Sequence, residues 1–388
     1  MEKIMEIARL KKENYGELIS LLNEVFSRQN GERSDFEKNL PKMCVRDDEH
    51  MQKHFGIFED GKLVAVIGVY PLPACVGGEE LTFSTVGNVA THPDYEGRGY
   101  MTALLGRAMK ELEDIGADAS RLCGMRHRYN RFGYETCGTR YSVAFTERNR
   151  KNRFFGIGED VTFVKIEGSD LELLKKAVEM QLSYRFAVER SEENGCFDVY
   201  ASMRAWQNVP YAAMKDGRMI GYLCVNPRGD TLAEQFAESA EATAEMICAW
   251  QRKYGGTVYF NLFPYDIESV RLFASRAEVV NVKSPSLFKI INWERVISAF
   301  MRLKASYTNM PEGELRIGIR DYGVLHLYVR GNSIGCERTE DGADITLDRL
   351  EAARYIFGPL PPEATAEASD TALRWFPLPL TWNGQDRV

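Results

Sequence analysis

The sequence predicts an α/β (α+β) chain in which two similar units are followed by a third, smaller α/β unit. The chain has 388 residues, which is more than one ordinary core accommodates. The order helix, hairpin, helix, strand occurs twice along it. In addition, one strand passes through a glycine-containing turn directly into a helix, which is typical of a layer with parallel strands.

The first unit is expected over residues 1–150. Apolar residues at helical spacing predict its helices, and β-forming residues bounded by Gly, Pro or Asp predict its strands. In chain order we expect a helix at 15–26, a hairpin turning at Asp60-Gly61, a strand at 81–93, a helix at 101–115, and strands at 119–125 and 139–147.

The second unit is expected over residues 151–284 and the third over 285–388. The second unit repeats the order of the first without its glycine turn. We expect a helix at 170–180, a hairpin at 209–226, one long helix at 232–256 and a strand at 257–264. In the third unit we expect a helix at 293–301, two strands at 315–321 and 324–331, a helix at 346–358 and a docked, extended segment at 372–388.

Composition narrows the class of protein. Hydrophobic residues make up 44% and charged residues 27% of the chain, as in soluble globular proteins. No apolar run is long enough to span a membrane, and we expect no signal peptide. The eight cysteines stand singly, which indicates a reducing cytoplasm. A net charge of −7 argues against nucleic acid as a partner, and we interpret the basic run at 148–153 as a solvated linker.

The sequence contains no convincing metal site. His50 and His54 have the spacing of two ligands on one helical turn, but Met51 stands where a zinc protease would carry Glu. No nearby Cys or His offers a third ligand. We therefore interpret the pair as a solvated polar face and expect no metal.

The segment DYEGRGYMTALL is the strongest candidate for a binding site. Backbone N–H groups at the start of a helix lack partners and carry partial positive charge, so they can bind an anionic phosphate. Gly97 and Gly99 would permit close approach, and Arg98 adds charge. The P-loop motif G-x-x-x-x-G-K-[ST] is absent. The motif G-x-G-x-x-G is not met either, because Thr102 stands in the place of the third glycine. Taken alone, the segment is equally compatible with a plain turn.

With its flanks, VGNVATHPDYEGRGYMTALLGRAM resembles the acetyl-CoA pyrophosphate loop of GNAT acetyltransferases. That family usually has Gln/Arg-x-x-Gly-x-Gly/Ala, and here Glu96, Gly99 and Met101 occupy the three places. Only Gly99 matches. GRGYMTALL followed by YNRFGYE resembles, more narrowly, the Eis (enhanced intracellular survival) acetyltransferases, and this resemblance accommodates Met101. It implies tandem GNAT folds, then a sterol-carrier-protein-like domain with a docked C-terminal strand.

The resemblance also implies catalytic roles. Tyr129, which opens YNRFGYE, would be the general acid that protonates the departing CoA thiolate. The carboxylate of Val388 would be the base for the attacking amine, and Asp386 is the alternative base. Backbone N–H groups of the strand that carries Asn88 to Thr91 would stabilise the oxyanion formed from the thioester carbonyl, and the same strand would pair with the pantetheine arm. The expected acetyl-CoA-binding residues are Asn88, Val89, Ala90, Thr91, Gly97, Arg98, Gly99, Tyr100, Met101 and Thr102.

Three further residues near these motifs have ordinary explanations. We interpret His92 and His127 as surface histidines, and Cys123 as a small buried hydrophobic side chain.

The resemblance implies an acetyl-CoA-dependent N-acetyltransferase without a metal, assembled as a homo-oligomer such as a hexamer. Its acceptor would be an amine of a cationic small molecule or peptide: an aminoglycoside, polyamine or lysine. Glu24, Asp35 and Glu37 are candidate acidic contacts for it. Two alternatives remain: a non-catalytic lipid- or small-molecule-binding protein on the same scaffold, and a tandem-GNAT transferase of another acyl group.

Overall fold

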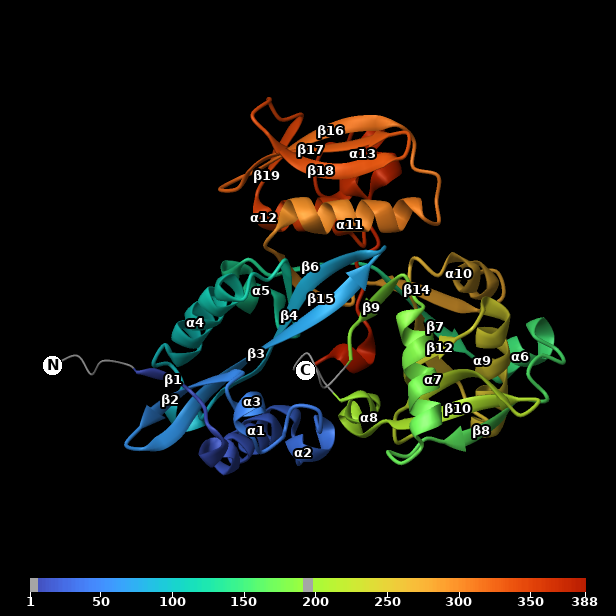
Figure 1. Ribbon diagram of the computed structural model, residues 1–388, viewed down its shortest axis with the longest axis horizontal. Helices are drawn as coiled ribbons and strands as arrows, with labels where there is room; N and C mark the ends of the chain where they lie inside the picture. Colours follow the sequence, from blue (N-terminus) through green and yellow to red (C-terminus); the bar gives the residue numbers. More distant parts are fainter. Residues whose placement is uncertain (1–5, 191–197) are drawn as a thin grey trace.

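The computed structural model describes residues 6–190 and 198–388. Figure 1 shows three lobes: the first (blue to teal) and second (green to yellow) lie side by side, and the third (orange to red) lies above them. The C-terminus lies between the first two. No helix within the described ranges is both long enough and apolar enough to cross a membrane.

The first lobe is built around one mixed sheet with a helix on each face. Its β4 and β5 strands run parallel and its other neighbouring strands are antiparallel. Helix α4 (Tyr100–Asp114) packs an apolar stripe that includes Leu104 and Leu105 on one face, and α1 (Tyr15–Asn30) covers the other. The spatial order is β1 (Ile7–Arg9), β2 (His54–Glu59), β3 (Lys62–Val76), β4 (Glu79–Thr91), β5 (Ala119–Leu122), β15 (Ser286–Ile290) and β6 (Glu135–Cys137), with β9 (Phe186–Val188) beside β3.

The predicted helices and hairpin of this lobe are confirmed, and three short helices complete it. They are α2 (Phe36–Asn39), α3 (Asp48–Met51) and α5 (Arg126–Tyr129).

The second lobe has two sheets joined by a parallel bridge between Thr231 and Tyr259. The first sheet runs β12 (Leu232–Ala237), β11 (Arg218–Val225), β10 (Val209–Lys215), β8 (Thr162–Lys165). The second runs β13 (Val258–Leu262), β7 (Arg140–Phe145), β14 (Val279–Lys283). Its helices are α6 (Glu147–Arg153), α7 (Leu171–Leu182), α8 (Val199–Met203), α9 (Ala240–Tyr254) and α10 (Ile267–Ala274).

The two lobes exchange a strand. Strand β7 directly follows the first lobe in the chain but lies between β13 and β14, whereas β15 follows the second lobe and lies between β5 and β6. Apart from this exchange, both lobes place their strands in the same order. Because each sheet needs a strand from the other stretch of chain, neither lobe can complete its fold alone.

The third lobe is a four-stranded sheet with helices packed on it. Helix α11 (Trp293–Ala305) lies against β18 and also contacts β3 and β4 of the first lobe. The sheet order is β18 (Ser333–Thr339), β17 (Gly323–Arg330), β16 (Gly313–Ile319), β19 (Ile345–Leu347), and the remaining helices are α12 (Arg349–Phe357) and α13 (Asp370–Trp375).

The prediction of one long helix over 232–256 is wrong at its start. Residues 232–237 form β12, which pairs antiparallel with β11, and α9 begins only after Ser239, whose side chain accepts a hydrogen bond from the Ala242 N–H. Ala, Glu and Gln favour helices, but sheet pairing and burial override that weak preference.

The basic run at 148–153 is not a linker. It forms α6, which starts with a capping box between Thr146 and Asn149. Asn149 is buried, and Arg150 Nε donates to Gln251 Oε1 at 2.6 Å. The capping pair was readable in the sequence, whereas the buried contact was not.

The C-terminal segment is docked as predicted, except that its first part forms helix α13. Trp382 packs against Phe83 and Phe288 of the first lobe. The final turn, η6 (Gly384–Asp386), rests on β12 of the second lobe, where a Cβ on Gly384 would lie only 2.4 Å from the Ala233 carbonyl oxygen. A glycine is therefore needed for this close approach.

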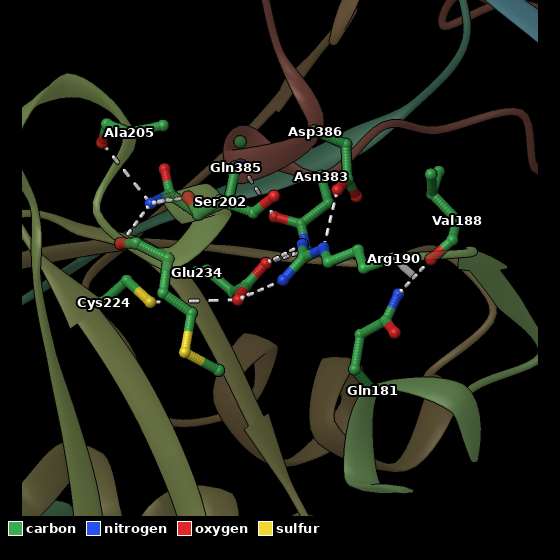
Figure 2. Close-up of polar contacts among 12 residues, drawn as sticks. Gln181, Val188, Arg190, Ser202, Ala205, Cys224, Glu234, Asn383, Gln385 and Asp386 are labelled. Atoms are coloured by element: carbon green, nitrogen blue, oxygen red, sulfur yellow. Dashed lines mark hydrogen bonds and ion pairs between the residues drawn. The ribbon is translucent and has the colours of Figure 1, made fainter. Parts of the chain in front are cut away.

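A buried ion cluster holds this turn in place (Figure 2). Arg190 donates from Nε to Asp386 Oδ1 at 2.8 Å and from Nη1 to Glu234 Oε1 at 3.0 Å, and all three side chains are almost fully buried. Asn383 also donates to Glu234. Burial lowers the pKa of Lys42 to about 7, and its Nζ donates to the Gln385 carbonyl.

We predict that Arg190→Met lowers the free energy of unfolding by about 3–5 kcal/mol, because it leaves two carboxylates buried without their partner. Arg218→Met breaks the exposed pair with Glu238 and should cost at most about 1 kcal/mol. Urea unfolding of both variants checks this. Equal losses in the two variants would contradict a buried cluster that stabilises the fold.

Candidate functional site

The site lies where β4 and β5 separate. The two strands pair only from Phe83–Ala119 to Val86–Leu122, and β5 then ends while β4 continues to Thr91. Among the described residues, no strand pairs with β4 on that side beyond Val86. The backbone of β4 is therefore free there to bind a ligand by strand-type hydrogen bonds.

A bulge shapes the free part of β4. Two residues of β4, Asn88 and Val89, oppose the single residue Ile67 of β3. Asn88 has a φ of 52°. Its side chain is buried and its Nδ2 donates to the Tyr70 hydroxyl at 2.9 Å. Asn88 thus fixes the bulge from inside the core, which explains why a polar residue stands in this strand.

The prediction that His50 and His54 form a solvated face is wrong for His54. His54 is 1% exposed, and its Nε2 lies 2.7 Å from the Tyr70 hydroxyl. Burial lowers the pKa of His54 to about 4, so the ring is neutral. Its place behind the bulge could not be read from spacing along the chain. In residues 6–190 and 198–388, no three His, Cys, Asp or Glu side chains gather to hold a metal ion.

The glycine turn and the start of α4 form the first cavity, which we call the loop cavity. Gly97 and Gly99 have φ values of 76° and 82°, which favour glycine. Gly99 is the N-cap of α4 and offers no side chain to its N–H groups, and the first turn of α4 contains no acidic residue. These N–H groups therefore remain available to an anion.

The loop cavity has a volume of about 440 Å³. It is lined by Gln29, Val89, Thr91, Tyr95, Glu96, Gly97, Gly99, Tyr100, Met101, Thr102 and Arg128. Seven of the ten predicted acetyl-CoA-binding residues are among these. Asn88 lines the neighbouring cavity instead, and Ala90 is buried in the core. Arg98 is exposed, and its guanidinium lies over the Tyr95 ring at 4.7 Å.

A second cavity of about 640 Å³ adjoins the first, with which it shares Gln29, Val89 and Arg128. We call it the Tyr129 cavity. Tyr129 ends α5, which is anchored by two hydrogen bonds from Arg126 to the buried Glu135. Burial raises the pKa of Tyr129, so its hydroxyl keeps its proton at neutral pH.

Val388 enters the same cavity from the docked C-terminus. A Cβ on Gly87 would lie 2.7 Å from Val388 Cγ2 and 3.4 Å from its terminal carbonyl carbon. The terminal residue therefore lies directly over the free edge of β4. Asp386, the alternative base, is 2% exposed and paired with Arg190, and it does not line this cavity.

Several other predictions about nearby side chains are corrected. Cys123 is exposed and lines the Tyr129 cavity, where Arg121 Nη2 donates to its Sγ at 2.6 Å. His92 is 6% exposed rather than on the surface, and its Nδ1 accepts from the Asp94 N–H. His127 is exposed, as predicted. Cys196 lies outside the described residues, and the other seven cysteines are free thiols.

The expected acidic contacts do not line the Tyr129 cavity. Glu24 pairs with Arg28, Asp35 caps α2 and pairs with Lys38, and Glu37 accepts a hydrogen bond from Tyr15. The cavity has further lining residues that the sequence motifs do not predict: Phe26, Phe36, Met125, Trp206 and Arg387. Only the docked C-terminus and the adjoining second lobe bring Arg387 and Trp206 to the first lobe, and no local signal in the sequence indicates this.

Comparison with known proteins identifies the first lobe. Residues 6–137 match the acetyltransferase (GNAT) domain family. No curated protein matches the sequence. Among solved structures, a GCN5-related N-acetyltransferase from Anabaena variabilis has 15% sequence identity and a TM-score of 0.67, covering 96% of this chain and 97% of that one.

Two further structures share the fold. Eis1 from Mycobacterium abscessus has 15% identity and a TM-score of 0.67, covering 98% of this chain and 99% of that one. A GCN5-related N-acetyltransferase from Kribbella flavida has 20% identity and a TM-score of 0.59, covering 90% and 88%. The tandem arrangement of lobes is thus a known fold over nearly the whole chain.

We predict that Gly87→Ala lowers the free energy of unfolding by about 1–3 kcal/mol, because its methyl group collides with Val388. The cost should shrink in a chain that lacks Val388. Gly106→Ala is the control: it lies in α4 with nothing within 4 Å of the added Cβ and should stabilise the helix by about 0.5–1 kcal/mol. If Gly87→Ala costs the same with and without Val388, the terminal residue does not lie over β4.

Proposed function

Since the chain is an N-acetyltransferase with a GNAT domain over residues 6–137, we propose that it transfers the acetyl group of acetyl-CoA to an amine bound in the Tyr129 cavity. Tyr129 acts as the general acid and the Val388 carboxylate as the base. The observation that carries the proposal is that these two residues, which are distant in the sequence, line one cavity beside the free edge of β4.

GNAT domains use acetyl-CoA, and the residues of the loop cavity fit its pyrophosphate. The uncapped N–H groups that follow Gly99 donate hydrogen bonds, and the dipole of α4 favours negative charge there. Arg128 lines the cavity and adds a positive charge. Glu96 also lines it and opposes phosphate binding, so the backbone groups and Arg128 must outweigh it. The pantetheine arm then pairs with the free backbone of β4.

The chain's own groups act at three atoms. The Val388 carboxylate takes the proton of the amine, because an ammonium has no electron pair for attack. Backbone N–H groups along Asn88–Thr91 donate to the thioester carbonyl oxygen as negative charge develops on it. Tyr129 gives its proton to the departing sulfur and regains one from the nitrogen, which loses its second proton as the amide forms. Burial suits Tyr129 to this role because it keeps the hydroxyl protonated until it is needed.

Asp386 is the weaker candidate for the base. Its carboxylate is paired with Arg190 in the buried cluster, so Asp386 could accept a proton only by losing this ion pair. We propose that Asp386 positions the base rather than serving as one.

The same proposal includes the domain organisation that the resemblance implies. The three domains span residues 1–150, 151–284 and 285–388, and strands β7 and β15 are exchanged between the first two. The third domain is sterol-carrier-like. The protein works as a homo-oligomer. The family resemblance supports these statements, as it supports acetyl rather than a longer acyl group. The family resemblance implies a polycationic acceptor. However, no acidic side chain is among the described residues that line the Tyr129 cavity.

We predict that Tyr129→Phe lowers kcat by about 10²–10⁴-fold, because general acids contribute on this scale. Binding of acetyl-CoA should be retained, since Tyr129 does not line the loop cavity. Release of the CoA thiol with a panel of amines measures kcat, and calorimetry measures acetyl-CoA binding. Tyr254→Phe, at an exposed tyrosine at the end of α9, is the control. An unchanged kcat in Tyr129→Phe would exclude the hydroxyl as the acid.

A further inference from the structure

The Tyr129 cavity carries a positive charge that the proposed chemistry does not use. Arg387 lines it, and its Nε donates to the Gly384 carbonyl at 2.8 Å. Arg121 and Arg140 do not line the cavity. Burial lowers the pKa of both, and the positive charge of nearby Arg387 lowers it further. The charge of the Asp386 carboxylate contributes to raising the pKa of Arg121, but Asp386 is already paired with Arg190.

Arg121 and Arg140 have buried nitrogen atoms without hydrogen-bond partners. Arg121 is 0% exposed, and its Nε and Nη1 have no hydrogen-bond partner. Arg140 Nε is likewise buried without a partner. Arg121 donates a hydrogen bond to Cys123 Sγ, which also faces the cavity, and its guanidinium lies over the Trp382 ring at 5.9 Å from the centroid. Buried guanidinium groups are costly unless an anion compensates them. Arg121 and Arg140 do not line the cavity, but their charge adds to that of Arg387 and Arg128, which do, and this favours an anionic group in the cavity.

The rest of the lining is largely apolar. Phe26 and Phe36 pack with ring centroids 4.9 Å apart on one side. Trp206 comes from the second lobe and is 38% exposed. Its φ of 61° is unusual for a bulky residue, and such strain persists where the surroundings enforce it, often at ligand sites. Gln207 holds this segment by donating to Asn39 Oδ1 at 2.8 Å.

The order of residues at the C-terminus relates these features to the reaction. Val388 carries the carboxylate that takes the amine's proton, and Arg387 is its immediate neighbour in the chain. An acceptor that uses both groups must carry an amine and an acidic group in one small molecule. It must also have a hydrophobic body for the aromatic side chains. The cavity volume of about 640 Å³ is ordinary for a small molecule.

Building on the proposed function, we propose that the acceptor is an amino acid with a large aromatic or apolar side chain. Its amine meets the Val388 carboxylate, its own carboxylate meets Arg387, and its side chain lies against Phe26, Phe36 and Trp206. In the reaction the ammonium loses one proton to Val388, and the free amine forms the C–N bond. The thioester C–S bond breaks, and the sulfur takes the proton of Tyr129. The second proton that the nitrogen loses as the amide forms returns to the Tyr129 oxygen.

This acceptor class differs from a polycation in a measurable way. Arg387 and Arg128 repel additional positive charges, whereas the only anion that the described lining offers is the terminal carboxylate. An amino acid carries one ammonium and one carboxylate, which pair with the Val388 carboxylate and with Arg387.

The experiment compares matched acceptors on the full-length protein with acetyl-CoA, detecting the CoA thiol and confirming the product by mass spectrometry. The pairs are tryptophan with tryptamine and phenylalanine with phenethylamine, together with spermidine and kanamycin. We expect kcat/KM to be at least about tenfold higher for each amino acid than for the amine that lacks its carboxylate. In Arg387→Met this ratio should fall close to one, and Arg387→Lys should restore part of it. Arg148→Met, at an exposed arginine of α6, should keep the wild-type ratio.

Each result decides between the two proposals. Equal or better turnover of tryptamine, phenethylamine or the polycations by the wild type would overturn the amino-acid acceptor but leave amine acetylation standing. An unchanged ratio in Arg387→Met would exclude Arg387 as the carboxylate contact. No transfer to any amine of the panel, with acetyl-CoA bound, would contradict the proposed function itself and this inference with it.

Discussion

The buried contact of Arg190 with Glu234 and Asp386 is the interaction on which the site depends. Arg190 follows β9 of the first lobe's sheet, Glu234 belongs to β12 of the second lobe, and Asp386 belongs to the last turn of the chain. One buried guanidinium thus joins three distant parts of the sequence. Two residues beyond Asp386, the terminal carboxylate emerges over Gly87. The chemistry proposed for Val388 is therefore available only in a chain whose lobes are correctly assembled.

The strand exchange has a similar consequence at larger scale. Because β7 completes the second lobe and β15 completes the first, the far side of β5 is paired by chain that lies more than 160 residues further on. Strand β5 ends at Leu122 and leaves the end of β4 without a neighbour. The free edge, the bulge at Asn88 and the uncapped start of α4 line two adjoining cavities. In the proposed function these three features serve one extended ligand, acetyl-CoA.

Sequence patterns predict the local features well and the long-range ones poorly. Helical spacing located α1 and α4, the Asp-Gly turns located both hairpins, and the glycine turn led to the loop cavity. Tyr129 and Val388 came from a family resemblance, not from periodicity. The misassigned residues are those whose environment is made by tertiary contact. His54 supports a bulge, Cys123 faces a cavity, and residues 232–237 are pulled into a sheet by β11. Trp206 and Arg387 carry no local mark of their role.

The central claim is that the terminal carboxylate, held by the docked C-terminus, takes the proton of the acceptor amine. Adding one glycine after Val388 tests it most directly, because this moves the carboxylate while the ion cluster and both cavities keep their residues. The matched variant is Val388→Ala, which keeps a terminal carboxylate at the same position. Steady-state kcat should fall by about 10²-fold or more in the extended chain, as expected for loss of a general base, and far less in Val388→Ala. Full activity in the extended chain would contradict the account.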